Sequence, residues 1–134
     1  MNTLEAFRTL LLSITALTAL ISTRIFYQMP KGAKANFPCV LITRIPAASS
    51  NQYILEEREC RVDVRCYGDG QPAANAVYAA LRDGIAGTNG LAAGSFYFES
   101  IIETIEGADL PEQVTDEERW DCVFSTYLMS ITTA

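Results

Sequence analysis

The sequence predicts an α+β domain in which a mainly antiparallel β-sheet of four to five strands carries two helices packed on one face. Three observations predict it. Apolar residues recur at helical spacing in two segments, near the N-terminus and after Gly70. Polar and apolar residues alternate over residues 58–67, as is typical of a strand with one wet face. The chain has 134 residues, 49% of them apolar, which suits a single domain over residues 1–134.

The first helix is expected over residues 3–21. Thr3 can cap its N-terminus. Its apolar stripe at helical spacing comprises Leu4, Phe7, Leu11 and Ile14. Ser13 or Thr15 can interrupt the helix, in which case a second short turn carries the apolar residues that follow.

The apolar stretch at residues 10–21 also resembles the core of a signal peptide. However, Glu5 cancels Arg8 in the leader, and no small-x-small cleavage site follows. Polar residues interrupt the stretch before it reaches the length of a membrane-spanning helix. We therefore interpret the segment as part of the mature fold and expect no membrane partner, with a secreted, disulfide-bearing domain as the alternative.

Residues 24–131 are expected to hold the sheet and the second helix. Strands are predicted at residues 24–27, 37–45, 58–67, 95–103 and 120–131. Pro38 cannot donate to a ladder, so it should lie at a strand start or on an edge. In the strand over residues 58–67, one face holds cysteines and valines, and the other holds Glu59, Arg61, Asp63, Arg65 and Tyr67.

The second helix is expected to begin near Pro72, a residue suited to the first helical turn. Its buried stripe is expected to comprise Ala73, Ala76, Val77, Ala80, Leu81 and Ile85. Gly84, Gly87 and Gly90 should end the helix and lead into a loose turn.

Composition argues against catalysis and against duplex binding. The chain has no histidine, which removes the usual general base and the commonest metal ligand. Its net charge of −6 does not suit a nonspecific DNA clamp. No phosphate-binding, hydrolase or metalloprotease motif is present. We predict no enzyme activity, no catalytic residue, no cofactor, no metal and no sequence-specific binding of nucleic acid.

An acidic segment extends over residues 103–121, where Arg119 is the one basic residue among eight acidic ones. Such a run is typical of a solvated loop between two strands. Alternatively, it forms an acidic surface that faces a like-charged neighbour or a basic partner.

The four cysteines are interpreted as buried, reduced thiols that pack as small apolar residues. Cys60 and Cys66 share one strand face about 20 Å apart, too far for a disulfide. Cys39 or Cys122 could still pair with either of them across strands. Without histidine, a zinc site would need all four cysteines from scattered positions. Reduced thiols favour a cytoplasmic origin.

The order of several motifs resembles the tail-completion and tail-terminator (tail-to-head joining) proteins of long-tailed bacteriophages. The motifs are LEAFRTLL (4–11), ALTALI (16–21), TRIF (23–26) and FPCVLI (37–42), then the charged strand (59–67) and the alanine-bearing helix (73–81). The resemblance covers most of residues 4–86. It implies a structural virion protein of the tail or neck, assembled in the cytoplasm of the host bacterium.

The resemblance further implies a homo-oligomeric ring, commonly of six copies, that caps the tail tube. Its partners would be the tail tube protein and the head–tail connector or adaptor protein, with DNA passing through the lumen. A tube or connector-adaptor subunit is the nearest rival within a virion.

A head-to-tail ring needs two different patches that complement each other. Candidate interface residues on the charged strand are Arg61, Asp63 and Arg65, and those in the acidic segment are Glu112, Asp116, Glu117 and Glu118. The acidic segment could instead line the channel and repel phosphate. The alternative from another class is a small soluble ligand-binding domain or enzyme with a pocket under Tyr53, Tyr67, Tyr97 and Glu99.

Overall fold

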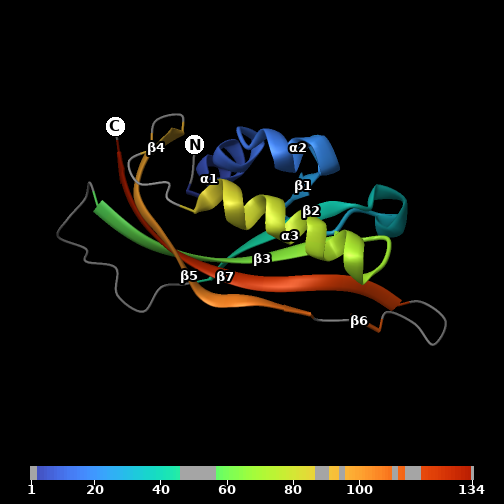
Figure 1. Ribbon diagram of the computed structural model, residues 1–134. Coiled ribbons are helices and arrows are strands. Elements are labelled where there is room, and N and C mark those ends of the chain that lie inside the picture. The colour runs from blue at the N-terminus through green and yellow to red at the C-terminus, as the bar shows by residue number, and fades with distance from the viewer. Residues whose placement is uncertain are drawn as a thin grey trace.

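The computed structural model shows three α-helices on one side of a seven-stranded sheet (Figure 1). It describes residues 3–45, 57–86, 91–93, 96–109, 112–113 and 119–133. The helices are α1 (Thr3–Leu12), α2 (Thr15–Ile21) and α3 (Gln71–Ile85). The strands are β1 (Ile25–Phe26), β2 (Cys39–Ile45), β3 (Glu57–Gly68), β4 (Leu91–Ala93), β5 (Phe96–Asp109), β6 (Glu112–Gln113) and β7 (Arg119–Thr133). A 3₁₀ turn spans Ala33–Asn36. The predicted α+β class is confirmed.

The strand order in the sheet is β1-β2-β3-β7-β5-β4, with β6 paired to one end of β7. β1 lies parallel to β2, and every other pairing is antiparallel, so the sheet is mixed. The long central strands β3, β7 and β5 carry most of the pairing and form one continuous curved surface (Figure 1). The expected count of four to five strands missed β4 and β6, which have three and two residues, too few for a periodicity to show.

The expected helix over residues 3–21 is divided into α1 and α2, which meet at 93°. Ile14 has an extended backbone (φ −82°, ψ 104°), and the Ser13 hydroxyl donates to the carbonyl oxygen of Leu10. This side-chain bond offers the last turn of α1 an alternative to continuing the helix. The bend allows both helices to reach the core, through Phe7 and Leu11 from α1 and through Leu17 and Ile21 from α2.

No single helix in the described part of the chain is both long enough and apolar enough to cross a membrane, although the bent α1–α2 pair together has that length and composition.

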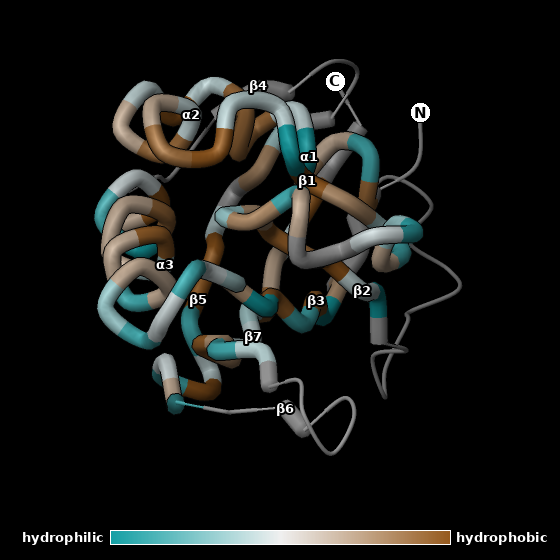
Figure 2. Tube along the Cα trace, turned by 90° about the vertical axis from the view of Figure 1, so that its right-hand side faces the viewer, coloured by the Kyte–Doolittle hydropathy of each residue, from teal (hydrophilic) through white to brown (hydrophobic). Residues whose placement is uncertain are grey.

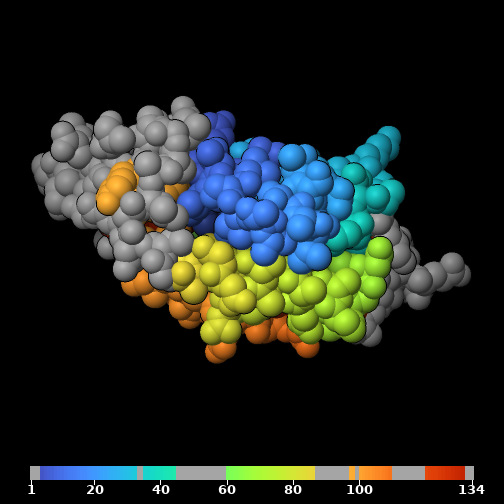
Figure 3. Space-filling view, turned by 45° about the horizontal axis from the view of Figure 1, so that its top comes forward, coloured from blue at the N-terminus to red at the C-terminus, as the bar shows by residue number. Residues whose placement is uncertain are grey.

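The helices form one layer over the core, with α3 beside the α1–α2 pair (Figure 3). In α3, Pro72 lies in the first turn as expected, and Val77, Leu81 and Ile85 are buried. Ala76, expected on this stripe, is exposed, and Ala74 is buried in its place. Ala74 lies three residues before Val77, on the helix face that meets the sheet.

The strand over residues 58–67 has the predicted alternation. Cys60, Val62, Val64 and Cys66 are buried beneath the helices, in the same core as Val40, Ile42, Tyr127 and Met129. Pro38 immediately precedes β2, as expected from its missing backbone donor. In Figure 2 the apolar residues, in brown, occur on the strands and helices that border this core.

Candidate interaction face of the sheet

The face of the sheet opposite the helices presents a mixture of charged and apolar side chains, and no described helix covers it (Figure 1). We define this open face by Arg61, Asp63, Arg65, Ile102, Ile105, Phe124, Thr126 and Leu128. Successive side chains of a strand point to opposite faces, so the burial of Val62 and Val64 beneath the helices directs their neighbours outward. The predicted interface residues Arg61, Asp63 and Arg65 therefore lie together on this face.

Each of these three β3 residues has a cross-strand neighbour on β7. Arg61 pairs with Leu128, Asp63 with Thr126 and Arg65 with Phe124. The Thr126 hydroxyl donates a 2.7 Å hydrogen bond to a carboxylate oxygen of Asp63. The guanidinium carbon of Arg65 lies 5.8 Å from the centre of the Phe124 ring, which is cation–π distance. These contacts orient the side chains of Asp63 and Arg65 on the sheet.

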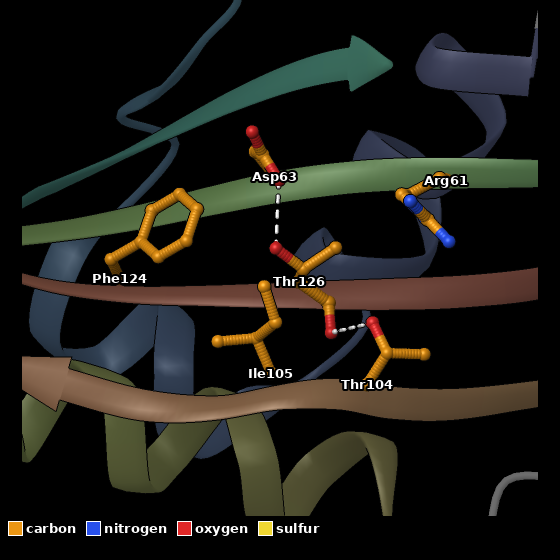
Figure 4. A pocket seen from close by; sticks show the side chains of 6 residues that line it. All are labelled: Arg61, Asp63, Thr104, Ile105, Phe124 and Thr126. Carbon is orange, nitrogen blue, oxygen red and sulfur yellow. Dashed lines mark hydrogen bonds between the residues drawn. The ribbon is translucent and has the colours of Figure 1, made fainter. Parts of the chain in front are cut away.

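A shallow depression of about 390 Å³ lies across β3, β7 and β5 on the open face (Figure 4). It is lined by Arg61, Asp63, Thr104, Ile105, Phe124 and Thr126. On its β5 side, Ile102 and Ile105 are 56% and 47% exposed. Exposed isoleucines beside paired charges suit contact with another protein surface. The sequence does not mark these isoleucines as neighbours on one face, because three register shifts in β5 break the alternation of the strand.

The prediction that the acidic segment forms a loop is wrong for residues 103–109, because β5 continues to Asp109. Glu112 belongs to β6, where its backbone pairs with Trp120, and Asp121 belongs to β7. Asp116, Glu117 and Glu118 lie outside the described residues. The backbone of Glu112 lies at the level of Trp120, about 13 Å along the strand direction from the level of Phe124 and Arg65.

Glu103 and Glu106 contact α3 within the same chain. One carboxylate oxygen of Glu103 accepts hydrogen bonds from the hydroxyls of Tyr78, at 2.7 Å, and Tyr127, at 3.0 Å. Nε of Arg82 lies 3.8 Å from the other oxygen of Glu103, and a second nitrogen of Arg82 lies 3.8 Å from Glu106. Burial and the nearby Glu103 carboxylate raise the pKa of both tyrosines, so both hydroxyls remain protonated donors. The cluster joins β5 to the helix layer.

Tyr67 lies on the same face of β3 as Arg61, Asp63 and Arg65, as the alternation predicts, but it is buried and not wet. It is 1% exposed and belongs to a small apolar cluster at one end of the open face, with Phe37, Cys39 and Cys122. Phe37 stacks on Tyr67 at 5.3 Å between ring centres, and Trp120 meets both rings edge-on. The chain between β1 and β2 supplies Phe37 to this cluster, a long-range contact that the period of a single strand does not reveal.

All four cysteines are buried thiols, as expected. Burial raises the pKa of Cys39 from 9.0 to about 12, although Arg24 acts in the opposite direction. Burial, followed by the neighbouring thiols of Cys122 and Cys39, also raises the pKa of Cys66. Thiols that stay protonated are poor nucleophiles and poor metal ligands. No cluster of potential metal ligands occurs among the described side chains.

The alternative pocket is not formed from the residues proposed for it. Tyr67 pairs with Cys122, whereas Tyr97 pairs with Thr132, ten residues further along β7. At strand spacing, this separates the two tyrosines by about 33 Å. Tyr53 and the side chain of Glu99 lie outside the described part of the chain.

Comparison with known proteins gives a likeness in structure and none in sequence. No family model and no curated protein sequence matches this chain. Its fold matches that of a chain in the structure "Virion of native gene transfer agent (GTA) particle", with a TM-score of 0.56. The match covers 92% of this chain and 91% of that chain, at 18% sequence identity. The two chains therefore share a fold over nearly their whole lengths.

Proposed function

We propose that this protein is a structural virion protein and not an enzyme. The observation that supports the proposal is the match of fold, over 92% of this chain, to a chain from a gene transfer agent virion. The match also covers 91% of that chain. A shared fold alone admits other functions, so a finer role has to be inferred from the surface of this chain.

The finer proposal is a subunit of a ring that terminates a phage tail tube and joins it to the head–tail connector. The resemblance of residues 4–86 to tail-completion proteins supports this role. The open face also supports it, since exposed isoleucines and fixed charges suit a protein contact better than an enclosed ligand. Partners would be further copies of the chain, six in the expected ring, with the tail tube protein and the connector or adaptor.

Two patches are candidates for contacts within such a ring. Arg61, Asp63 and Arg65 lie on the open face, and Glu112 lies at the far end of the β5–β7 hairpin. Together with Asp116, Glu117 and Glu118, Glu112 would supply an acidic partner patch for a head-to-tail interface. A net charge of −6 further suits a lumen through which DNA passes without binding.

The first experiment is to measure solution mass by light scattering after gel filtration over a range of concentrations, followed by negative-stain imaging of the largest species. A closed ring, or a mass that rises toward six copies, would support the proposal. A monomer that gains thermal stability with a small molecule, and forms no ring on isolated tail tubes, would contradict it and favour the ligand-binding alternative.

A further inference from the structure

We propose that neighbouring copies join edge to edge, so that the β5 edge of one copy pairs antiparallel with the β2 edge of the next and Glu106 lies near Arg44. This inference rests on the proposed ring and assigns its joint to the two edges of the sheet, in place of the open-face patch at Arg61, Asp63 and Arg65. The partner at both edges is a second copy of this chain. Four features of the two edges favour this joint: open strand segments, strand direction, level along the sheet, and charge.

Both edges of the sheet have strand segments without a described partner. β1 pairs only with residues 40 and 41 of β2, which leaves residues 42–45 open. β4 pairs only with residues 96–98 of β5, which leaves residues 99–109 without a described strand partner on that side. Within this segment the backbone N–H of Gly107 already donates to the Tyr78 hydroxyl. In Figure 2, β2 and β5 lie on opposite sides of the sheet, with β3 and β7 between them. Unpaired backbone groups at such edges are able to extend the sheet into another chain.

The strand directions are compatible with this pairing. β2 is antiparallel to β3, β3 to β7, and β7 to β5, so β5 runs opposite to β2. Rotation about an axis parallel to the strands keeps these directions. The β5 edge of one copy would therefore meet the β2 edge of the next as an antiparallel pair.

The open segments also lie at the same level along the strands. Thr43 is in register with Asp63, Asp63 with Thr126, and Thr126 with Ile105. One residue further along β2, Arg44 is in register with Val62, Val62 with Tyr127, and Tyr127 with Glu103. A rotated copy without translation along the axis therefore brings residues near 105 beside residues near 43, offset by the tilt of the strands.

Charge distinguishes the two edges. Residues 6–55, which hold β1 and β2, contain no acidic residue and five basic ones: Arg8, Arg24, Lys31, Lys34 and Arg44. On β5, the acidic side chains Glu103, Glu106 and Asp109 contact α3 or its first turn, so they project on the helix side of the sheet. Arg44 projects to the same side, since its cross-strand neighbour Val62 is in the core, and it is exposed.

Glu106 is the acidic residue best placed to contact a second copy. Its side chain is 75% exposed, and its ion pair with Arg82 is long, at 3.8 Å. Such an exposed pair contributes little by itself. Like charges would oppose pairing of two β5 edges, whereas the basic β2 edge would be attracted. Opposite charges at the two edges thus favour head-to-tail joining over symmetric dimers.

The first test reverses charge at each edge. Glu106→Arg or Arg44→Glu should each weaken self-association by roughly tenfold or more, and the double variant should recover it. Asp83→Arg is the matched control, because it makes the same charge change at an exposed position on α3. Association would be measured by sedimentation, and folding by thermal melting followed by circular dichroism.

The second test uses a cysteine pair, Thr43→Cys with Ile105→Cys. Within one chain these positions are three strand spacings apart, about 14 Å, beyond the reach of a disulfide. Oxidation should therefore give a ladder of covalent oligomers on a non-reducing gel, with little background from the four buried native cysteines. Thr43→Cys with Asp83→Cys is the control and should give no regular ladder.

The outcomes separate this inference from the proposed ring. If wild-type rings form but neither charge reversal alters their assembly and no ladder appears, edge-to-edge joining is wrong and the ring remains. If the ladder and the charge rescue appear but imaging shows open filaments, edge-to-edge joining is supported and the closed ring is wrong. A chain that gives neither rings nor a ladder, in solution or on isolated tail tubes, contradicts both proposals.

Discussion

Glu103 illustrates how a single residue in a charged run can have a structural role. Its place in the acidic segment predicted a solvated side chain, yet one of its oxygens accepts hydrogen bonds from Tyr78 and Tyr127. Tyr78 also accepts a 2.9 Å hydrogen bond from the backbone N–H of Gly107. A Cβ at Gly107 would lie 2.4 Å from the Tyr78 ring, so only glycine permits this approach. The distribution of charge along a segment describes that segment as a whole. It does not identify hydrogen-bond partners that are distant in the sequence, such as Tyr78 and Tyr127.

Replacing Tyr78 with phenylalanine should destabilise the fold. The change removes the donor to Glu103 and the acceptor for Gly107 while leaving the ring in place. We expect a loss of about 1–3 kcal/mol in the free energy of unfolding, measured by urea titration. Tyr27→Phe is the matched control, at a side chain that is 44% exposed. Equal effects of the two substitutions would show that the Glu103 cluster contributes no stability.

Stability should fall in alkaline solution because buried acids stay protonated in the folded state. The pKa of Cys39 rises from 9.0 to about 12 on folding, and burial also raises that of Cys66 and Tyr127. Below pH 9 both states hold these protons. Above it, the unfolded chain releases them first, so the folded state loses up to about 1.4 kcal/mol per pH unit for each thiol.

Urea titrations at several pH values from about 8 to about 10.5 would measure this loss. Cys39→Ala removes one of the titrating thiols, so its stability should decline less steeply with pH than that of the wild type. An identical decline in both proteins would contradict the assigned role of Cys39.

At the scale of elements, hydrophobic periodicity and the positions of proline and glycine predict most of the helices and strands. The alternation of β3, the early proline of α3 and the helical stripe of α1 are local signals, and the structure contains all three elements. Tyr67 and the far end of β5 depart from the prediction because their environments depend on distant segments. Tyr67 is covered by Phe37, and β5 is extended by pairing with β7 as far as Asp109.

The candidate interaction face was predictable only in part. The alternation of β3 alone predicts that Arg61, Asp63 and Arg65 share a face. The shared face of Ile102 and Ile105 could not be predicted in this way, because the register of β5 shifts three times. The open edges depend on the order of strands in the sheet, with β5 and β2 on opposite sides. That order is a tertiary property, which residue alternation in a single strand does not contain.

The junction between β3 and α3 should be the position where a small substitution is least tolerated. A Cβ at Gly68 would lie 2.4 Å from the backbone nitrogen of Ala74 and 2.7 Å from the carbonyl carbon of Ala73. Backbone atoms cannot move aside without shifting the start of α3. We therefore expect Gly68→Ala to cost about 1–3 kcal/mol, measured as a lower Tm with a matching change in urea midpoint.

Gly84→Ala is the informative comparison, because its Cβ would meet side-chain atoms of Ile14 at 2.5–2.9 Å. A side chain can adopt another rotamer, and near the end of α3 alanine is a better helix former than glycine, by at most about 1 kcal/mol. Gly84→Ala should therefore cost less than Gly68→Ala. The reverse order would mean that the junction yields more readily than the contact between α2 and α3.

For the whole molecule, the dependence of assembly on salt should reveal which surface joins the copies. On the helix side of the sheet, the β2 edge carries the basic Arg44 and the β5 edge the acidic Glu103, Glu106 and Asp109, whereas the open face exposes Ile102 and Ile105. Contacts between exposed charges weaken as the Debye length falls from about 10 Å at 0.1 M to about 3 Å at 1 M ionic strength. Burial of apolar area persists in sodium chloride and is strengthened by sulfate.

We expect the mass measured by light scattering to fall as sodium chloride rises from about 0.05 M to about 1 M, while the thermal melt remains cooperative. Glu106→Arg with Arg44→Glu should show the same salt dependence as the wild type, because the attraction is restored with reversed signs. Arg61→Glu with Arg65→Glu leaves both edges unchanged and should assemble as the wild type does if the edges form the joint. A mass that rises with sulfate and falls only in the Arg61 and Arg65 variant would instead assign the joint to the open face.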